Sequence, residues 1–206
     1  ELKDSRILSW SEDGTLRLWK VPTVSPESGT TMHAATRMKA HEDRVIGVMP
    51  LMNGLQRNRE LLSWSKDKSL QFWMPSGHSL ARFTGHTEGV RGAIELKDGR
   101  ILSWSEDKSL RLWEPPWGRS IATFWGHDSA INGAIELSDG RFLSWSDDKT
   151  LRLWSPDGTV LARLMGHTSY VRGALELSDG RLLSWASDKT PRLWTTDGAT
   201  LTTLDG

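Results

Sequence analysis

The sequence predicts an all-β fold built from repeated antiparallel sheets of four strands, and two observations support this prediction. The first is a segment that reads Phe-Leu-Ser-Trp-Ser-Asp-Asp-Lys-Thr-Leu-Arg-Leu-Trp at residues 142–154 and occurs five times with small variations. The copies are 54, 40, 41 and 40 residues apart, and they end at Trp19, Trp73, Trp113, Trp154 and Trp194. The second is that short apolar runs alternate with turn residues, without helical periodicity. Such a period is typical of units that bury their apolar faces by stacking on their neighbours.

The unit that follows His127 shows the four strands in order. Its predicted strands are residues 131–137, 141–146, 150–154 and 159–164. The first turn is Ser138-Asp139-Gly140, because an Asp-Gly pair supplies the positive φ that a tight hairpin needs. The next turns are predicted at 147–149 and 155–158. Four short strands joined in this way favour an antiparallel sheet.

One such sheet cannot cover both of its faces, whereas a ring of sheets can, so the repeat predicts a β-propeller. A chain of 206 residues with five copies of one unit is expected to form a single domain, residues 1–206. Its blades are predicted at roughly 1–38, 39–84, 85–125, 126–165 and 166–206.

The first of these five blades is predicted to lack its innermost strand. Residues 1–8 align with residues 95–102, so Glu1 falls where the innermost strand of a blade ends. We therefore expect an incomplete ring. Because an open arc exposes apolar faces and unpaired strand edges, we expect further blades, from a longer parent chain or from a second chain, to complete it.

The spacing of a few residues in each unit resembles the WD40 repeat. Gly85-His86, Gly126-His127 and Gly166-His167 each place the histidine 27 residues before the closing tryptophan. Ala40-His41 is a variant with a gap of 32 residues, and every copy has an aspartate six residues before its tryptophan. The resemblance covers essentially the whole chain. One departure is that the closing tryptophan is followed by Lys20, Met74, Glu114, Ser155 or Thr195, where the family usually has aspartate.

The resemblance implies a structural hydrogen-bond chain in each blade, which links a tryptophan indole, a serine hydroxyl, a histidine ring and a turn aspartate. The implied sets are His41–Ser63–Asp67–Trp73, His86–Ser103–Asp107–Trp113, His127–Ser144–Asp148–Trp154 and His167–Ser184–Asp188–Trp194. Ser9, Asp13 and Trp19 belong to a first blade without the histidine. Such half-polar rings are buried when their N–H groups find partners.

Serine, histidine and aspartate are also the residues of a hydrolytic triad. Here the set recurs once in each blade, whereas an active site is normally built once, so a structural role is favoured and no catalytic residue is predicted. The four histidines lie on four different blades and cannot converge on one metal ion, and no cofactor motif stands out. The alternative is an enzyme or small-ligand lectin that uses the central channel, which an unrepeated polar cluster at the channel mouth would favour.

Composition narrows the class of partner. Lys plus Arg equals Asp plus Glu at 26 each, which argues against a dedicated nucleic-acid binder. The chain has no cysteine, and no apolar run approaches the length of a membrane span. We expect a cytoplasmic protein that binds a protein or peptide rather than a membrane or nucleic acid.

Ten of the 12 tryptophans occupy two fixed positions of the repeat and are expected to be core residues. At the second position the family usually has a small residue, so the five tryptophans there need space from a neighbour. They are Trp10, Trp64, Trp104, Trp145 and Trp185. We expect this space from the glycine six residues after each repeat histidine, which is Gly47, Gly92, Gly133 or Gly173. Trp117 and Trp125 lie outside the pattern and are candidates for exposed contacts.

The partner is expected at one end of the ring, called here the top face, where the loops after each histidine and before each turn aspartate meet. The predicted top-face residues are Arg44, Ile46, Lys66, Arg91, Glu106, Asn132, Asp147, Tyr170, Arg172 and Ser187. They vary among nearly identical blades, which fits a surface adapted for contact and also fits neutral drift of loops. Tyr170 and Arg172 are the leading candidates, because tyrosine and arginine anchor many interfaces. At the opposite end, residues 21–32 and 52–59 are either tolerated insertions or a docking point.

These observations lead us to expect a non-catalytic scaffold for protein interaction or sensing. Near-identical tandem blades resemble the highly repetitive WD40 arrays of bacterial signalling or defence proteins. That resemblance implies that the propeller is the recognition part of such a protein.

Overall fold

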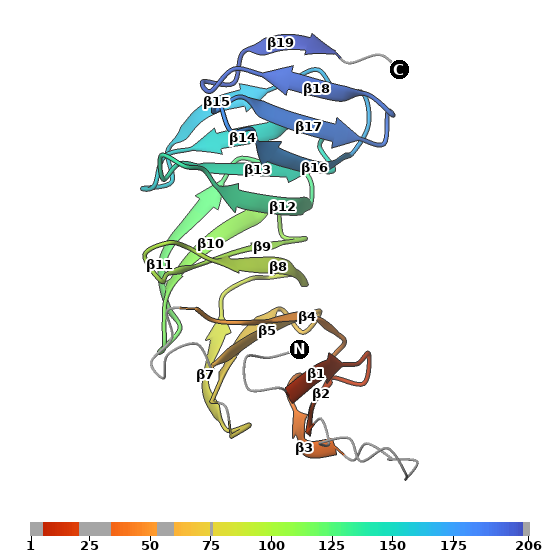
Figure 1. Ribbon diagram of the computed structural model, residues 1–206, viewed down its shortest axis with the longest axis vertical. Helices are drawn as coiled ribbons and strands as arrows, with labels where there is room; N and C mark the ends of the chain where they lie inside the picture. Colours follow the sequence, from red (N-terminus) through yellow and green to blue (C-terminus); the bar gives the residue numbers. More distant parts are fainter. Residues whose placement is uncertain (1–5, 21–33, 53–59, 75, 204–206) are drawn as a thin grey trace, which may run out of the picture.

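The described residues form five antiparallel sheets that follow one another along an open arc (Figure 1). This computed structural model describes residues 6–20, 34–52, 60–74 and 76–203. Each sheet contains strands that are consecutive in the sequence, so each sheet is one blade of the repeat. The described residues form strands, turns and bends but no helix. The predicted all-β class with antiparallel blades is therefore confirmed.

The strands occur in the expected order within each blade. In blade 1 the described residues form three strands, β1 (Arg6–Trp10), β2 (Thr15–Lys20) and β3 (Ala34–Lys39). Blade 2 contains β4 (Val45–Pro50), β5 (Leu61–Ser65), β6 (Ser69–Trp73) and β7 (Ser79–Thr84). Blade 3 contains β8 (Val90–Glu95), β9 (Ile101–Ser105), β10 (Ser109–Glu114) and β11 (Arg119–Trp125). Blade 4 contains β12 (Ile131–Glu136), β13 (Phe142–Ser146), β14 (Leu151–Trp154) and β15 (Val160–Leu164). Blade 5 contains β16 (Val171–Glu176), β17 (Leu182–Ala186), β18 (Pro191–Trp194) and β19 (Thr200–Thr203).

Local turn chemistry explains where the strands of blade 4 begin and end. Gly140 takes a φ of +86° and closes the hairpin between β12 and β13, as its Asp-Gly pair predicts. Between β13 and β14 the left-handed residue is instead Lys149, with φ at 70°. The Asp148 carboxylate supports this turn, because it accepts the backbone N–H of Thr150 at 2.9 Å.

The first strand of each four-stranded blade lies on the inner side of the arc. Strands β4 and β8, β8 and β12, and β12 and β16 contact one another across the blade boundaries. The later strands of each blade extend outward from this inner row (Figure 1). Loops from successive blades consequently meet at common ends of the sheets.

The core is divided into one apolar cluster for each pair of neighbouring blades. Between blades 4 and 5, Leu143, Trp145 and Leu153 pack with Val171, Leu182 and Trp194. Equivalent clusters join blades 3 and 4, blades 2 and 3, and blades 1 and 2. Burying one large apolar side chain contributes about 1.5–3 kcal/mol. Because each cluster contains residues of two blades, stacking between blades stabilises the fold. This is the packing that the repeat predicts.

The two end blades have faces that no other described residue covers. Trp145 in blade 4 is 9% exposed, whereas its equivalent Trp185 in blade 5 is 41% exposed. Trp10 in blade 1 is 48% exposed, because the described residues place no strand inside β1. These two tryptophans therefore differ from the core role expected at their repeat position.

The prediction of an incomplete ring whose first blade lacks its inner strand is confirmed for the described residues. The expected strand end at residues 1–5 lies outside these residues. So do the insertion at 21–32 and, apart from Met52, the insertion at 52–59.

Candidate interaction surface

Each four-stranded blade contains a buried chain of hydrogen bonds from a tryptophan to an aspartate. In blade 4 the Trp154 indole donates to Ser144 Oγ at 2.8 Å, and that oxygen lies 2.8 Å from His127 Nε2. His127 Nδ1 lies 2.7 Å from Asp148 Oδ2. The equivalent contacts in blades 2, 3 and 5 measure 2.8–3.0 Å. The structure thus brings together all four sets that the WD40 resemblance grouped, and in blade 1 Trp19 donates to Ser9 at 2.9 Å.

Burial decides what this chain can do chemically. The order aspartate, histidine, serine is that of a hydrolytic triad, in which the serine must reach a substrate atom. Here all four serines, Ser63, Ser103, Ser144 and Ser184, are fully buried. Each serine oxygen also accepts a tryptophan N–H, so the group is already engaged. The geometry therefore joins a core tryptophan to a surface turn and presents no nucleophile.

Electrostatics keep the hydrogen-bond chain of blade 4 in one protonation state near neutral pH. Burial acts to raise the pKa of Asp148, but hydrogen bonds from His127 and Thr150 outweigh it and hold this pKa well below its usual range. The same balance lowers the pKa of Asp67 and Asp107. For the His127 ring, burial lowers the pKa and the bond to Asp148 opposes this only in part. Neutral His127 accordingly donates through Nδ1 to the carboxylate and accepts the Ser144 hydroxyl at Nε2.

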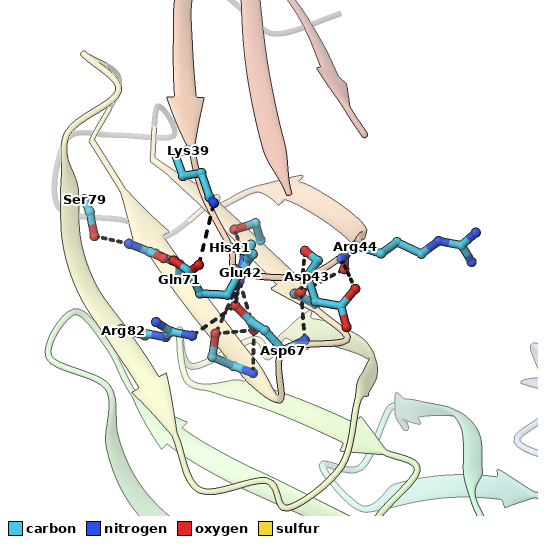
Figure 2. A network of polar contacts seen from close by, with 12 residues as sticks. Lys39, His41, Glu42, Asp43, Arg44, Asp67, Gln71, Ser79 and Arg82 are labelled. Carbon is cyan, nitrogen blue, oxygen red and sulfur yellow. Dashed lines mark hydrogen bonds and ion pairs between the residues drawn. The ribbon is translucent and has the colours of Figure 1, made fainter. Parts of the chain in front are cut away.

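The turn aspartate also orders the loop on the top face, as Asp67 illustrates (Figure 2). Its Oδ2 accepts the backbone N–H of Glu42 at 3.0 Å and Arg82 Nη2 at 3.0 Å. Its Oδ1 accepts the Ser69 hydroxyl at 2.6 Å. One carboxylate therefore fixes the loop after His41, the turn before β6 and the outer strand β7.

The predicted top-face residues of blades 2 to 4 contact one another across the blade boundaries. Lys66 of blade 2 forms an ion pair with Glu106 of blade 3. Arg91 of blade 3 donates from Nη1 to Asn132 Oδ1 at 2.5 Å and to Asp147 Oδ2 at 3.1 Å, both in blade 4. Its Nε donates to Glu106 at 3.3 Å. These contacts connect three successive blades.

Two further contacts extend the series to blades 1 and 5. Asn132 donates to the Val171 carbonyl of blade 5 at 2.9 Å and to Asp147 Oδ1 at 2.8 Å. At the other end, Arg44 extends away from the Asp67 cluster (Figure 2) and pairs with Glu12 of blade 1. A polar side-chain contact therefore crosses every boundary between described blades. Ile46 lies half-buried beside this series.

The top-face residues of blade 5 differ, because the polar and cation–π contacts of their side chains among the described residues are with each other. Arg172 Nε donates to Ser187 Oγ at 2.7 Å, and Arg172 Cζ lies 5.3 Å from the centroid of the Tyr170 ring. All three side chains are exposed, and Tyr170 is 47% exposed. Arg172 occupies the repeat position of Arg91, but no described blade follows for it to reach. The result is an arginine held against an aromatic face at the surface.

Sequence reasoning missed Glu12 and the pairing between blades. Glu12 precedes the turn residue Asp13 as Lys66 precedes Asp67, so its position gave a usable signal. A second signal was the sign of the charges, since basic Lys66 is followed one repeat later by acidic Glu106. Complementary charges at one repeat position indicate contacts between neighbouring units.

In blades 2 to 5, the tryptophan at the second repeat position packs on a glycine of the same blade, as expected. Trp145 on β13 pairs with Gly133 on β12, and a Cβ atom added to Gly133 would lie 2.2 Å from the indole. The corresponding distances at Gly47, Gly92 and Gly173 are 2.0–2.3 Å. The buried indole N–H groups of Trp64, Trp104 and Trp145 have no hydrogen-bond partner among the described residues.

Other features of the described residues bear on the site. Trp117 and Trp125, which lie next to and at the end of β11, are 76% and 59% exposed. Within the described ranges, no group of three His, Cys, Asp or Glu side chains is arranged to hold a metal ion. The same part of the chain has no helix of the length and apolar character needed to cross a bilayer.

Repeated antiparallel blades joined by buried hydrogen-bond chains define a protein of the β-propeller class, seen here as an incomplete ring. Residues 77–114 and 118–155 match the family model described as WD domain, G-beta repeat. The resemblance to the WD40 repeat is therefore confirmed for these two segments. Members of this family are typically non-catalytic and generally act as scaffolds for interactions between proteins. No curated protein matches the chain.

Proposed function

We propose that this chain is a non-catalytic scaffold that binds a protein or peptide partner through the top face of blade 5. Tyr170, Arg172 and Ser187 form the contact. The observation that supports this choice is the cation–π pair, which is exposed while the equivalent residues of blades 2 to 4 are engaged by neighbouring blades. A rigid aromatic ring beside an arginine loses little conformational entropy on binding and is typical of interface anchors. We further propose a reducing, cytoplasmic location, which the absence of cysteine suits.

The experiment compares proteins retained by the immobilised chain with those retained by a Tyr170→Ala/Arg172→Ala variant. Quantitative mass spectrometry of the eluates is the readout. Both side chains are exposed, so the variant is expected to unfold at the same temperature as the parent. The variant should lose one or more proteins by about tenfold or more, as expected when two anchors are removed.

A matched control is Arg181→Ala/Leu201→Ala, which removes an exposed arginine and an exposed apolar residue elsewhere on blade 5. This variant should retain the same proteins as the parent. Identical retention by all three proteins would rule out the Tyr170 surface as the recognition site.

We also propose that further blades, from a longer parent chain or a second chain, cover the apolar face of blade 5 around Trp185 and leave the Tyr170–Arg172 pair accessible on the top face. In blade 4 the equivalent face packs against blade 5 and buries Trp145. In blade 5 the same face leaves Trp185 exposed and Leu183 only half-buried. A face with the same residue types as its covered copies is suited to the same kind of neighbour.

A further inference from the structure

The outer edge of blade 3 differs from the outer edges of the other blades. Its last strand, β11, has seven residues and is the longest of the described strands. It pairs with β10 on one side, and no described strand pairs with its other side. The strand begins at Arg119, which pairs with Glu114 at 3.5 Å, and residues 120–125 carry no charge. This uncharged stretch lies on the outer side of the arc (Figure 1).

Thr123 on β11 occupies a repeat position that is arginine in three other blades. The arginines are Arg37 in β3, Arg82 in β7 and Arg163 in β15. Their side chains are 41–64% exposed, and each lies 3.0–3.8 Å from an aspartate oxygen. Charged side chains on an edge strand hinder its pairing with another strand, and β11 lacks this protection. In blade 5 the position is Thr203, but the described strand β19 has only four residues.

The same part of β11 exposes apolar side chains. Residues 122–125 pair with β10 without interruption, and Ile121 is the bulged residue before them. Phe124 is buried in the cluster between blades 3 and 4, and Ala122 packs against that cluster. Ile121 and Trp125 are instead 46% and 59% exposed. The edge therefore combines unpaired backbone with apolar side chains that no described residue covers.

An antiparallel pair of two β11 strands centred on Thr123 matches these residues to one another. In this register Thr123 lies opposite Thr123 of the second copy, and Ile121 lies opposite Trp125 in both halves. Thr–Thr pairs and aromatic–β-branched pairs are favourable across antiparallel strands. The same register in β3, β7 or β15 would set arginine opposite arginine, which is destabilising. This self-complementarity favours a second copy of the chain over an unrelated strand.

We propose that two copies of this chain associate through β11. The two blades 3 then form one continuous antiparallel sheet, with a two-fold axis at Thr123 that closes the assembly as a dimer. This surface lies on the outer edge of blade 3 and is separate from the top face of blade 5. Each dimer therefore presents two Tyr170–Arg172 pairs, and a partner with two matching sites would gain affinity from binding both.

The test uses the full chain in sedimentation velocity experiments over a range of protein concentrations. The parent should show a monomer and a dimer in equilibrium. Thr123→Arg should weaken the dimer by about tenfold or more, because it sets like charges opposite each other. Folding should tolerate this arginine, because Asp107 occupies the repeat position at which Asp67 accepts Arg82. The matched control Thr203→Arg makes the same change in blade 5 and should dimerise as the parent does.

A charge swap tests the register directly. Thr123→Glu should also be monomeric, and an equal mixture of the Thr123→Arg and Thr123→Glu chains should restore the dimer, because opposite charges then face each other. The chain has no cysteine, so Thr123→Cys should form a disulfide-linked dimer on oxidation, whereas Thr203→Cys should not. The proposal is overturned if the parent is monomeric at every concentration, if Thr123→Arg dimerises as the parent does, or if the mixture stays monomeric. Loss of the dimer in Thr203→Arg alone would also overturn it, because blade 5 would then be the contact.

Discussion

Arg91 of blade 3 reaches Asp147 of blade 4, with its Nη1 3.1 Å from the carboxylate Oδ2. Both residues occupy repeat positions that vary from blade to blade, next to a histidine–serine–aspartate–tryptophan chain that does not vary. Variation at these positions therefore matches each blade to its neighbour. Near-identical units need such a device, because without it any blade face could stack on any other. Among the described blades, blade 5 is the one in which the residues at these repeat positions remain available to bind a partner.

The two tryptophans of blade 4 should differ in their contribution to stability. Trp154 donates its N–H to Ser144 at 2.8 Å, whereas the buried N–H of Trp145 has no described partner. Trp154→Phe leaves Ser144 Oγ without its indole donor, and Trp145→Phe removes an unsatisfied group. We expect Trp154→Phe to reduce the free energy of unfolding by about 1 kcal/mol or more beyond Trp145→Phe in urea denaturation. Equal losses would contradict the structural role assigned to the hydrogen-bond chain.

Gly133 should be intolerant of substitution only while Trp145 is present. Gly133→Ala places a Cβ atom against the indole and should cost about 1–3 kcal/mol. In a Trp145→Leu background the same substitution should cost much less, so the two changes should be strongly non-additive. Thermal and urea unfolding of the four proteins measure this coupling. Additive losses would show that the glycine is there for another reason.

The features that follow from local chemistry were predictable from the sequence. Alternating apolar residues and Asp-Gly turns placed the strands of blade 4 within one residue of their observed ends. The left-handed Lys149 was not predictable from its own preference, because the Asp148 side chain supports that turn. The four sets of histidine, serine, aspartate and tryptophan were predicted from the resemblance to WD40 repeats, and not from the residues alone.

Features that depend on how blades stack were not predicted. Arg91 and Asp147 are 56 residues apart, and nothing local to either residue indicates the contact. The exposure of Trp10 and Trp185 depends on whether a neighbouring strand or blade is present, which a repeat pattern cannot show. For the contacts between blades, the sequence offered the repeat position of Glu12 and the complementary charges of successive units.

Stability should fall on acidification in two stages. Burial lowers the pKa of His127 and His167 in the folded protein, so the unfolded chain takes up protons first, and the free energy of unfolding decreases below about pH 6.5. The depressed pKa values of Asp148 and its equivalents produce a further loss below about pH 4. Urea denaturation from pH 7.5 to 3.5 is the measurement. His127→Gln should reduce the first stage, and a flat profile between pH 7 and 5 would contradict the assignment of buried neutral histidines.

Leu143 and Leu183 occupy the same position of the repeat in blades 4 and 5. Leu143 lies on a face that the next blade covers, whereas Leu183 lies on an open face. Leu143 is fully buried between blades 4 and 5, and Leu183 is half-buried on blade 5. Leu143→Ala should cost about 2–5 kcal/mol, and Leu183→Ala less than half of that. Chemical denaturation of the two variants at one protein concentration tests this. Equal costs would mean that another surface covers blade 5 in solution.

The central claim is that variable top-face residues couple neighbouring blades, and the most direct test is the coupling free energy between Arg91 and Asp147. It is obtained from urea denaturation of the parent, Arg91→Ala, Asp147→Ala and the double variant. The exposed pair Arg181 and Asp179, which lies within one turn, is the control for a local ion pair. We predict a favourable coupling of about 0.5–1 kcal/mol for Arg91 with Asp147, as expected for half-buried groups in one network. Additive losses, with a coupling of zero within error, would contradict the claim.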